Sequence, residues 1–131
     1  NSLQTQGTWI ESNGAPGFYG AGYHYAEAGT GESVATWSFT TEQSGKYQVY
    51  ARWAAHDNRA TNAPYTIHHT EGETTVHADQ TTNGGQWNLL GSFAMNRGEE
   101  MEIILTNNAN GIVVADAIRI VQEKPSGWLV Y

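Results

Sequence analysis

The sequence predicts an all-β domain, because its 131 residues combine many glycines, few charges and short alternating segments. Charged residues make up 15% of the chain, below the usual share of about 25%, and there are 15 glycines, above the usual share of about 7%. This composition favours strands joined by tight turns over long solvated helices. No window of a dozen residues carries a clean helical period, so we expect about nine to ten strands and no substantial helix.

The clearest strand is predicted over residues 46–54. Its odd-numbered positions, from Tyr47 to Trp53, alternate with a second set of side chains, which is the period of two expected of a pleated strand with unlike faces. Upstream, residues 33–40 place Trp37 in the same kind of alternating register. We therefore expect Trp37 and Trp53 to lie in the core of the domain.

A hairpin is predicted over residues 63–79. A two-residue turn at Glu71-Gly72 would place Ile67 opposite Val76, so that the apolar side chains of both strands share one face. The same register gathers polar side chains on the opposite face, where water is expected.

Three further strands complete the predicted architecture. A loop over residues 81–86 leads into a strand that carries Trp87, Leu89, Gly91 and Phe93 in one register. The other two strands are predicted over residues 101–106 and 112–121. Many short antiparallel strands with two unlike faces must bury one face against another sheet, which predicts a jelly-roll β-sandwich. The chain shows no repeat or internal break in composition, so we expect one domain over residues 1–124 and a tail or linker stub over residues 125–131.

The charge and composition exclude several classes of partner. Six basic against 13 acidic residues give a net charge of -7, which disfavours nucleic acid and anionic membrane surfaces. No apolar run approaches the ~20 residues that a spanning helix needs. The absence of cysteine excludes disulfides and thiolate metal sites. We expect a monomer that binds neither nucleic acid nor membrane.

Local catalytic signatures are missing from the sequence. It contains no Gly-x-Ser-x-Gly nucleophile motif, no His-x-Glu-x-x-His zinc motif and no phosphate-binding loop. Strand alternation sends His68 and His69 to opposite faces, so at most one of them joins His77, and two imidazoles alone make a poor metal site. The sequence therefore predicts that the domain is not an enzyme and has no transition-metal site.

Asp116 is the most informative acidic residue. It lies in register with Ile118 in the strand predicted over 112–121, so it faces the core unless that strand bulges, and an unpaired buried carboxylate costs several kcal/mol. Two arrangements would compensate this cost. The carboxylate is held by backbone amides or by Arg52 or Arg59, or it is a ligand of a structural Ca²⁺ shared with Glu11.

The loop over residues 54–62 carries a dense set of hydrogen-bonding side chains, which is the kind of set that binds sugar hydroxyls. The candidate ligand-binding residues of this loop are His56, Asp57, Asn58 and Arg59. Arg59 is equally a candidate for ordering the loop itself.

A sugar-binding face also needs an aromatic plane on which a pyranose ring stacks. The first candidate for this plane is Trp87, which follows a flexible Asn-Gly-Gly-Gln stretch. Further candidates in or next to the glycine-rich segment 17–25 are Tyr19, Tyr23 and Tyr25. Packing in the core or at its rim is the alternative role for each of these rings.

Five stretches of the chain together carry a family resemblance. They are YARWAA at 50–55, RATNAPYTIHH at 59–69, DQ at 79–80, GQWNLLGSF at 85–93 and VVADAIR at 113–119. In these stretches, and over nearly the whole chain, the sequence resembles the golvesin-type domain, also called the golvesin/xanthan-lyase carbohydrate-binding-like domain. The signature positions that this resemblance carries over are Arg52, Arg59, Asp79, Gln80, Trp87 and Asp116.

The resemblance implies a galactose-binding-like jelly roll that is an appendage of secreted bacterial enzymes, including polysaccharide lyases. The expected function is a non-catalytic, extracellular carbohydrate-binding module without a cofactor, whose partners are a polysaccharide and the attached catalytic domain. The alternative is a structural or protein-interaction domain that packs against a catalytic neighbour or spaces it from the cell surface.

Overall fold

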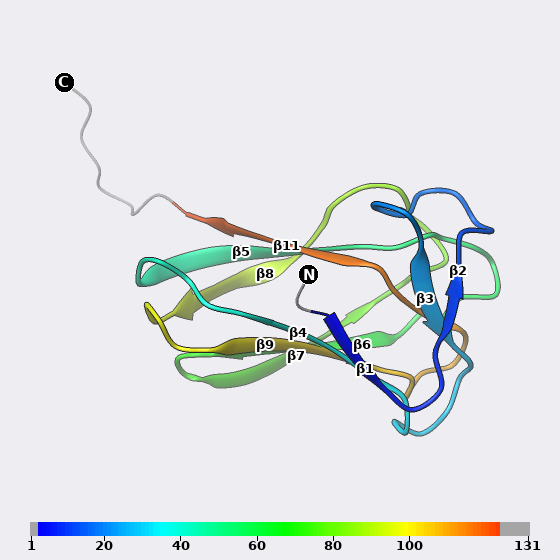
Figure 1. Ribbon diagram of the computed structural model, residues 1–131, viewed down its shortest axis with the longest axis horizontal. Coiled ribbons are helices and arrows are strands. Elements are labelled where there is room, and N and C mark those ends of the chain that lie inside the picture. The colour runs from blue at the N-terminus through cyan, green and yellow to red at the C-terminus, as the bar shows by residue number, and fades with distance from the viewer. Residues whose placement is uncertain (1–2, 124–131) are drawn as a thin grey trace.

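Eleven strands form three sheets in the computed structural model, which describes residues 3–123 (Figure 1). In chain order the strands are β1 (Leu3–Gln6), β2 (Ile10–Ser12), β3 (Tyr23–Ala26), β4 (Val34–Phe39), β5 (Gly45–Arg52), β6 (Ala63–His69), β7 (Gly72–Ala78), β8 (Asn88–Met95), β9 (Met101–Thr106), β10 (Val113–Ala115) and β11 (Ala117–Gln122). Within the described residues there is no helix, and hence none long and apolar enough to cross a membrane. The all-β prediction is confirmed, and the predicted tail over 125–131 lies outside the described residues.

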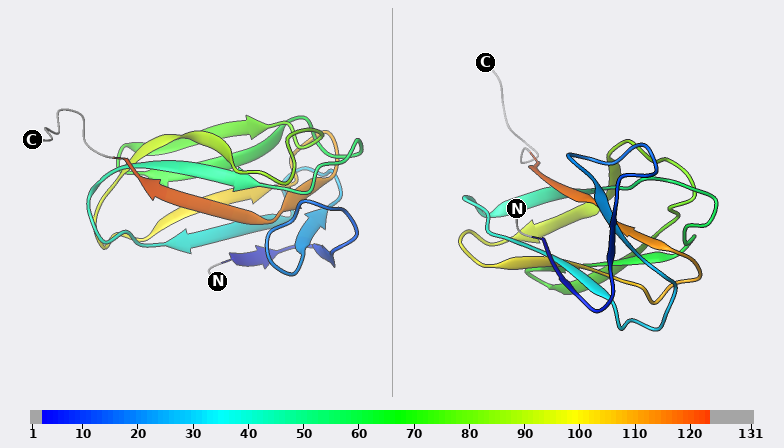
Figure 2. Two further views of the ribbon diagram at one scale, coloured as in Figure 1. Left: turned by 90° about the horizontal axis from the view of Figure 1, so that it is seen from above. Right: turned by 45° about the vertical axis from the view of Figure 1, so that its right-hand side comes forward.

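The strands pack as two layers, with all strand pairs antiparallel (Figures 1 and 2). One layer is the five-stranded sheet β1-β4-β9-β6-β7. The other contains the sheet β11-β5-β8, and a smaller sheet, β10-β3-β2, adjoins it at one end. The structure has eleven strands where nine to ten were predicted, in part because the strand predicted over 112–121 is divided into β10 and β11 at Asp116.

The core lies between these layers and is built from the alternate, inward-facing side chains of each strand. Trp37 is 6% exposed and Trp53 is 3% exposed, which confirms the prediction that both indoles are core residues. The Trp37 ring stacks on Tyr65 across a centroid distance of 6.5 Å. Burial of side chains of this size contributes roughly 2–3 kcal/mol each to the stability of the fold.

The predicted hairpin over residues 63–79 is present as β6 and β7, but its register differs by two residues from the prediction. Tyr65, and not Ile67, pairs with Val76, because the turn is formed by Thr70-Glu71. A shift of two residues keeps every side chain on its predicted face, because the side-chain period of a strand is two. The polar outer face is therefore as predicted.

A bulge in β8 makes the register predicted for this strand wrong. Tyr50 of β5 pairs with Leu89 and Val49 pairs with Gly91, which leaves Leu90 as the extra residue. Leu89 consequently turns outward and is 56% exposed, whereas Phe93 packs against the core. The bulge thus places an apolar side chain on the outer face of the β11-β5-β8 sheet.

Candidate functional site

The loop that precedes Trp87 begins at a buried hydrogen-bond hub, Gln80. Its side-chain amide donates to the Tyr65 hydroxyl (3.0 Å) and to the Val114 carbonyl (2.9 Å), and its carbonyl accepts the Val114 N–H (2.8 Å). Gln80 is fully buried, and burial also raises the pKa of the Tyr65 hydroxyl. This signature position therefore fixes the start of the loop to both layers of the sandwich.

Hydrogen bonds to Trp53 hold the rest of this loop, which closely approaches the glycine-rich segment 13–22 at Gly17 and Gly85. The Trp53 indole N–H donates to the Thr82 carbonyl (2.8 Å), and the Gly85 N–H donates to the Trp53 carbonyl (3.1 Å). Gly17 and Gly85 both have positive φ values, 101° and 72°, and a Cβ on Gly17 would lie 2.9 Å from the Gly85 nitrogen. Glycine is required at position 17 because no side chain fits between the two segments.

This close approach places Tyr19 beside Trp87, where the two rings and Arg52 form the Tyr19–Trp87 cluster. The ring centroids of Tyr19 and Trp87 are 5.5 Å apart at an interplanar angle of 55°. The Arg52 guanidinium carbon lies 5.6 Å from the Trp87 ring centroid, and its Nε donates to the Gly17 carbonyl (3.1 Å). Tyr19 is 60% exposed and Trp87 is partly exposed, so both rings are accessible from solvent.

Asp116 lies behind this cluster, at the interruption between β10 and β11. Its Oδ2 accepts the Tyr19 N–H (2.9 Å). Burial raises the pKa of Asp116 to about 6, against the opposing effects of the Tyr19 N–H and the Arg52 charge. The prediction of one continuous strand is wrong here, and a backbone amide together with Arg52 stabilises the carboxylate.

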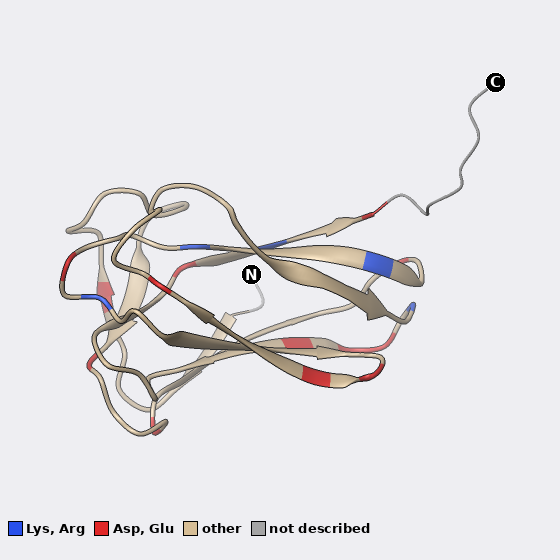
Figure 3. Cartoon of the chain, turned by 180° about the vertical axis from the view of Figure 1, so that it is seen from behind, with Lys and Arg blue, Asp and Glu red and all other residues tan. Residues whose placement is uncertain are grey.

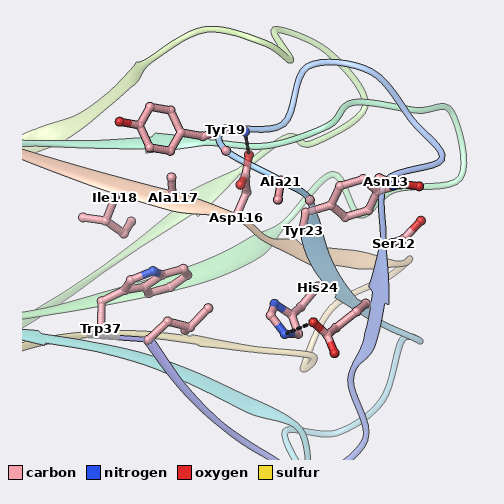
Figure 4. Close-up of a pocket in the computed structure, with 14 residues that line it drawn as sticks. Ser12, Asn13, Tyr19, Ala21, Tyr23, His24, Trp37, Asp116, Ala117 and Ile118 are labelled. Carbon is pink, nitrogen blue, oxygen red and sulfur yellow. Dashed lines mark hydrogen bonds and ion pairs between the residues drawn. The ribbon is translucent and has the colours of Figure 1, made fainter. Parts of the chain in front are cut away.

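An open groove of about 780 Å³ begins on the other side of Tyr19 (Figure 4). Trp37 and His24 face the opening from the side opposite Asp116 and Ala117. The volume is within the range of small-ligand sites, and aromatic rings beside a few hydrogen-bonding groups match the chemistry of a sugar.

The predicted set in the loop over residues 54–62 forms a separate group around Arg59. Arg59 is 9% exposed, and its Nε donates to the Ala54 carbonyl (3.0 Å). One terminal nitrogen donates to Asn58 Oδ1 (3.0 Å), and the guanidinium carbon lies 5.8 Å from the Tyr23 ring centroid. The Tyr23 hydroxyl is buried and accepts the Ala15 N–H (3.1 Å). In this structure Arg59 orders its own loop.

The remaining predicted residues surround this group. His56 and Asp57 are exposed and contact one another, with His56 Nδ1 2.8 Å from Asp57 Oδ1. Tyr25 is partly buried, and its ring centroid is 6.5 Å from that of Tyr23. The structure thus places Trp87 with Tyr19 and the loop residues in a second group, and Tyr23 packs with that second group and also lines the groove beside Tyr19.

The sequence pattern offered Tyr19 only as one candidate plane, and Arg52 only as a signature position and a partner of Asp116, outside the set of candidate ligand-binding residues. No local signal separates Tyr19 from Tyr23, because both lie in or next to the segment with glycines at positions 14, 17, 20 and 22, and Tyr23 is only 5% exposed. Arg52 alternates with buried Ala51 and Trp53, so its outward direction was readable from the strand period.

The two carboxylates considered for calcium, Glu11 and Asp116, both line the groove. Glu11 Oε1 lies 3.9 Å from His24 Nε2, and Asp116 accepts the Tyr19 N–H. Within residues 3–123 there is no group of three or more His, Asp or Glu side chains arranged to hold a metal ion. Calcium binding by these two carboxylates stays an untested alternative, with its test given below.

Known proteins resemble this chain in sequence and in fold. The xanthan lyase of Bacillus sp. (strain GL1) is 33% identical over 120 residues, which are 88% of this chain and 13% of that enzyme. The solved Paenibacillus xanthan lyase superposes with a TM-score of 0.87 at 41% identity, covering 94% of this chain and 12% of that one. The chain therefore spans about an eighth of the length of the enzymes that it matches.

More distant solved structures share the fold alone. A CBM35 from Cellvibrio japonicus superposes with a TM-score of 0.65 at 20% identity, covering 92% of this chain and 87% of that one. Another CBM35, solved with a disaccharide that contains glucuronic acid, gives 0.59 at 18% identity, covering 93% and 91%. These carbohydrate-binding modules confirm the predicted jelly-roll class. Because the model of the Golvesin C-terminal domain matches residues 1–122, the chain belongs to that family.

Proposed function

We propose that this chain is a non-catalytic carbohydrate-binding module that holds an attached, secreted enzyme on a polysaccharide. The observation that carries the proposal is the accessible Tyr19–Trp87 cluster beside a groove of about 780 Å³. Two tilted rings offer apolar planes to the C–H face of a pyranose, and the groove offers polar groups to its hydroxyls.

The similar proteins support this proposal. Two of them are xanthan lyases, of which this chain matches only a small part, and others are carbohydrate-binding modules of like length. A module of this kind raises the local concentration of an attached enzyme on its polymer instead of taking part in the reaction. Secretion is part of the proposal, since a polysaccharide outside the cell is the expected target.

Affinity electrophoresis tests the proposal directly. The folded chain is run through native gels that contain neutral or acidic polysaccharides, and at least one polymer should retard it relative to a gel without polymer. Tyr19→Ala should reduce that retardation. His77→Ala, which removes an exposed ring from β7 on the other layer, should leave it unchanged. Equal mobility on every gel would reject carbohydrate binding.

A second candidate function is packing against the attached catalytic domain. It is favoured by the exposure of Leu89 and by the small share of each xanthan lyase that this chain matches. The two functions predict different results for Leu89→Ser in a protein that contains both domains. Loss of domain contact, measured by limited proteolysis, supports packing, whereas loss of polysaccharide retention with intact domain contact supports carbohydrate binding.

A further inference from the structure

The outer face of the β11-β5-β8 sheet continues from the Tyr19–Trp87 cluster along the strands. Tyr50 of β5 pairs with Leu89 on one side and with Arg119 on the other. The Arg119 guanidinium carbon lies 5.5 Å from the Tyr50 ring centroid, and the Tyr50 hydroxyl donates to Gln48 Oε1 (2.7 Å). We call this surface the basic-aromatic face; its residues are Lys46, Gln48, Tyr50, Arg52, Trp87, Leu89 and Arg119.

Positive charge is concentrated on this face. Residues 3–123 contain five Lys or Arg and all 13 Asp and Glu, and three of the five basic residues, Lys46, Arg52 and Arg119, belong to the basic-aromatic face. Figure 3 shows blue segments on the layer that contains β5 and β11, and red segments on the strands of the other layer.

Two carboxylates lie close to the ends of the face. Glu123 contacts the Ser92 hydroxyl next to the Lys46 end, and Asp116 accepts the Tyr19 N–H behind the Arg52 end. Arg52 pairs with Ala117 and Arg119 pairs with Tyr50, so the two arginines are diagonal neighbours across β5 and β11. Neither carboxylate lies between them. The middle of the face therefore presents two guanidinium groups and two aromatic rings without a carboxylate between them.

We propose that the basic-aromatic face binds a polysaccharide that carries carboxylate groups. This inference rests on the proposed function and adds the chemical class of its ligand. A guanidinium group matches the planar geometry of a carboxylate and forms paired hydrogen bonds with it. The Trp87 and Tyr50 rings and the Leu89 side chain supply apolar contacts for sugar rings between those charged positions.

The extent and the charge of the face fit an extended acidic chain. From Lys46 to Arg52 the strand β5 spans about 20 Å, which is long enough for several consecutive sugar rings. The net charge of -7 repels an anionic polymer from most of the surface. A basic strip on an acidic protein thus selects the orientation in which such a polymer approaches, and this selection weakens as salt screens the charges.

The test compares carboxylate-bearing with neutral polymers on affinity gels of the full chain. Xanthan, polygalacturonic acid and alginate are the acidic probes, and hydroxyethylcellulose is the neutral probe. Retardation is expected on at least one acidic polymer and should fall as salt rises. Arg119→Gln should weaken that binding about three- to tenfold, since a charged hydrogen-bonded pair is lost, and Arg119→Lys should restore part of it.

The matched control is Arg97→Gln, which removes the same charge from the exposed turn between β8 and β9. It should leave binding within about twofold of the unmodified chain, because that turn is remote from the face. Circular dichroism and thermal melting establish that each variant is folded.

Three results would overturn the inference. The first is the absence of retardation on all three acidic polymers. If the neutral polymer still retards the chain in that case, carbohydrate binding stands and only the preference for carboxylate groups is rejected. The second is an equal effect of Arg119→Gln and Arg97→Gln. The third is binding of the isolated catalytic domain to this face, abolished by Arg119→Gln, with polysaccharide retention unchanged.

Discussion

The two layers of the sandwich present outer faces of opposite chemistry. On the β11-β5-β8 sheet the outward positions carry two arginines, a lysine, aromatic rings and exposed Leu89. On the described strands of the five-stranded sheet they carry no Lys, Arg, Trp, Tyr or Phe. They are instead occupied by side chains such as Thr66, Thr75, Glu73 and Glu102. Both faces are built on the same alternation, with one side of each strand buried.

The contrast shows where this fold leaves sequence free to vary. Packing between the layers dictates the inner side chains, whereas the outer ones need only suit water. Threonine pairs such as Thr66–Thr75, whose hydroxyls are 2.8 Å apart, suit a solvated sheet with high strand propensity. On the other face Arg52 also donates to the Gly17 carbonyl, but solvation alone does not call for the exposed Arg119 guanidinium on the Tyr50 ring or for exposed Leu89, and these side chains support a bound ligand.

The largest expected effect is that of Trp87→Ala on polysaccharide binding. Removal of the ring takes away the plane on which both Tyr19 and Arg52 pack, so we expect affinity to fall roughly tenfold or more. Trp87→Phe should retain part of the affinity because it keeps an aromatic plane. Isothermal titration with an oligosaccharide of the best-retained polymer measures both, and equal affinity for all three proteins would break the comparison.

Two glycine substitutions, one beside the Tyr19–Trp87 cluster and one in the five-stranded sheet, compare how strongly each region constrains the backbone. Gly17→Ala meets both a left-handed φ and the Gly85 backbone at 2.9 Å, and we expect a loss of about 2–3 kcal/mol in unfolding free energy. Gly72→Ala, in the β6–β7 hairpin, meets a φ of 121° but no atom within 4 Å, and should cost about 1 kcal/mol. Urea denaturation measures both values. An equal loss would show that the contact between the loops does not constrain position 17.

A smaller effect is expected from Asp116→Asn, which tests the electrostatics behind the Tyr19–Trp87 cluster. Burial raises the pKa of Asp116 from its ordinary 3.8 to about 6, so the folded state binds this proton more tightly than the unfolded state does. The contribution to stability is present below about pH 4 and is lost as pH rises to about 6. Asparagine removes the desolvated charge and keeps an acceptor for the Tyr19 N–H.

The variant should accordingly be more stable than the unmodified chain at pH 7–8 by about 1 kcal/mol, a value discounted for partial exposure, and the difference should vanish near pH 4. Thermal melting across this pH range measures it, with Asp57→Asn on the exposed loop as the matched control. A difference independent of pH would contradict the account of Asp116.

Substitutions on the five-stranded sheet should have the smallest effect on binding. Glu73→Gln and Glu102→Gln each remove a carboxylate near His68, and binding to acidic polymers should stay within about twofold, because the face takes no part in it. The same gel assay measures this. A loss of binding as large as that caused by Arg119→Gln would show that the polymer binds the five-stranded sheet and not the basic-aromatic face.

Removal of calcium is expected to change nothing measurable. Glu11 and Asp116 each have a partner within the chain, so the midpoint of thermal unfolding should be the same in EDTA and in millimolar Ca²⁺. A rise of several degrees with Ca²⁺ would restore the alternative that these two carboxylates hold a structural ion.

Patterns local in sequence predicted what is local in structure. The alternation that buries Trp37 and Trp53, and the faces of the 63–79 hairpin, follow from a period of two that a reader can count. The outward direction of Leu89 was not predictable in this way, because it depends on a bulge that only the pairing of β8 with β5 defines. The interruption of the last strand at Asp116 likewise depends on a contact with Tyr19, 97 residues away.

The candidate site was predicted only in part for the same reason. Trp87 was a candidate because it directly follows a glycine-rich loop, a position that favours an accessible indole. The polar loop over 54–62 resembles a ligand-binding set in sequence, but Arg59 donates its hydrogen bonds within the loop, to the Ala54 carbonyl and to Asn58. No local pattern reveals that Gly17 meets Gly85, and this contact is what places Tyr19 beside Trp87.

The most direct test of the central claim is a titration of the ¹⁵N-labelled chain with oligogalacturonate, followed through backbone amide chemical shifts. If the basic-aromatic face binds the polymer, the shifts should concentrate on β5, β8, β11 and residues 17–22, and Arg119→Gln should weaken the response along β11. Shifts confined to β7 and β9, or spectra unchanged at millimolar oligosaccharide, would contradict it.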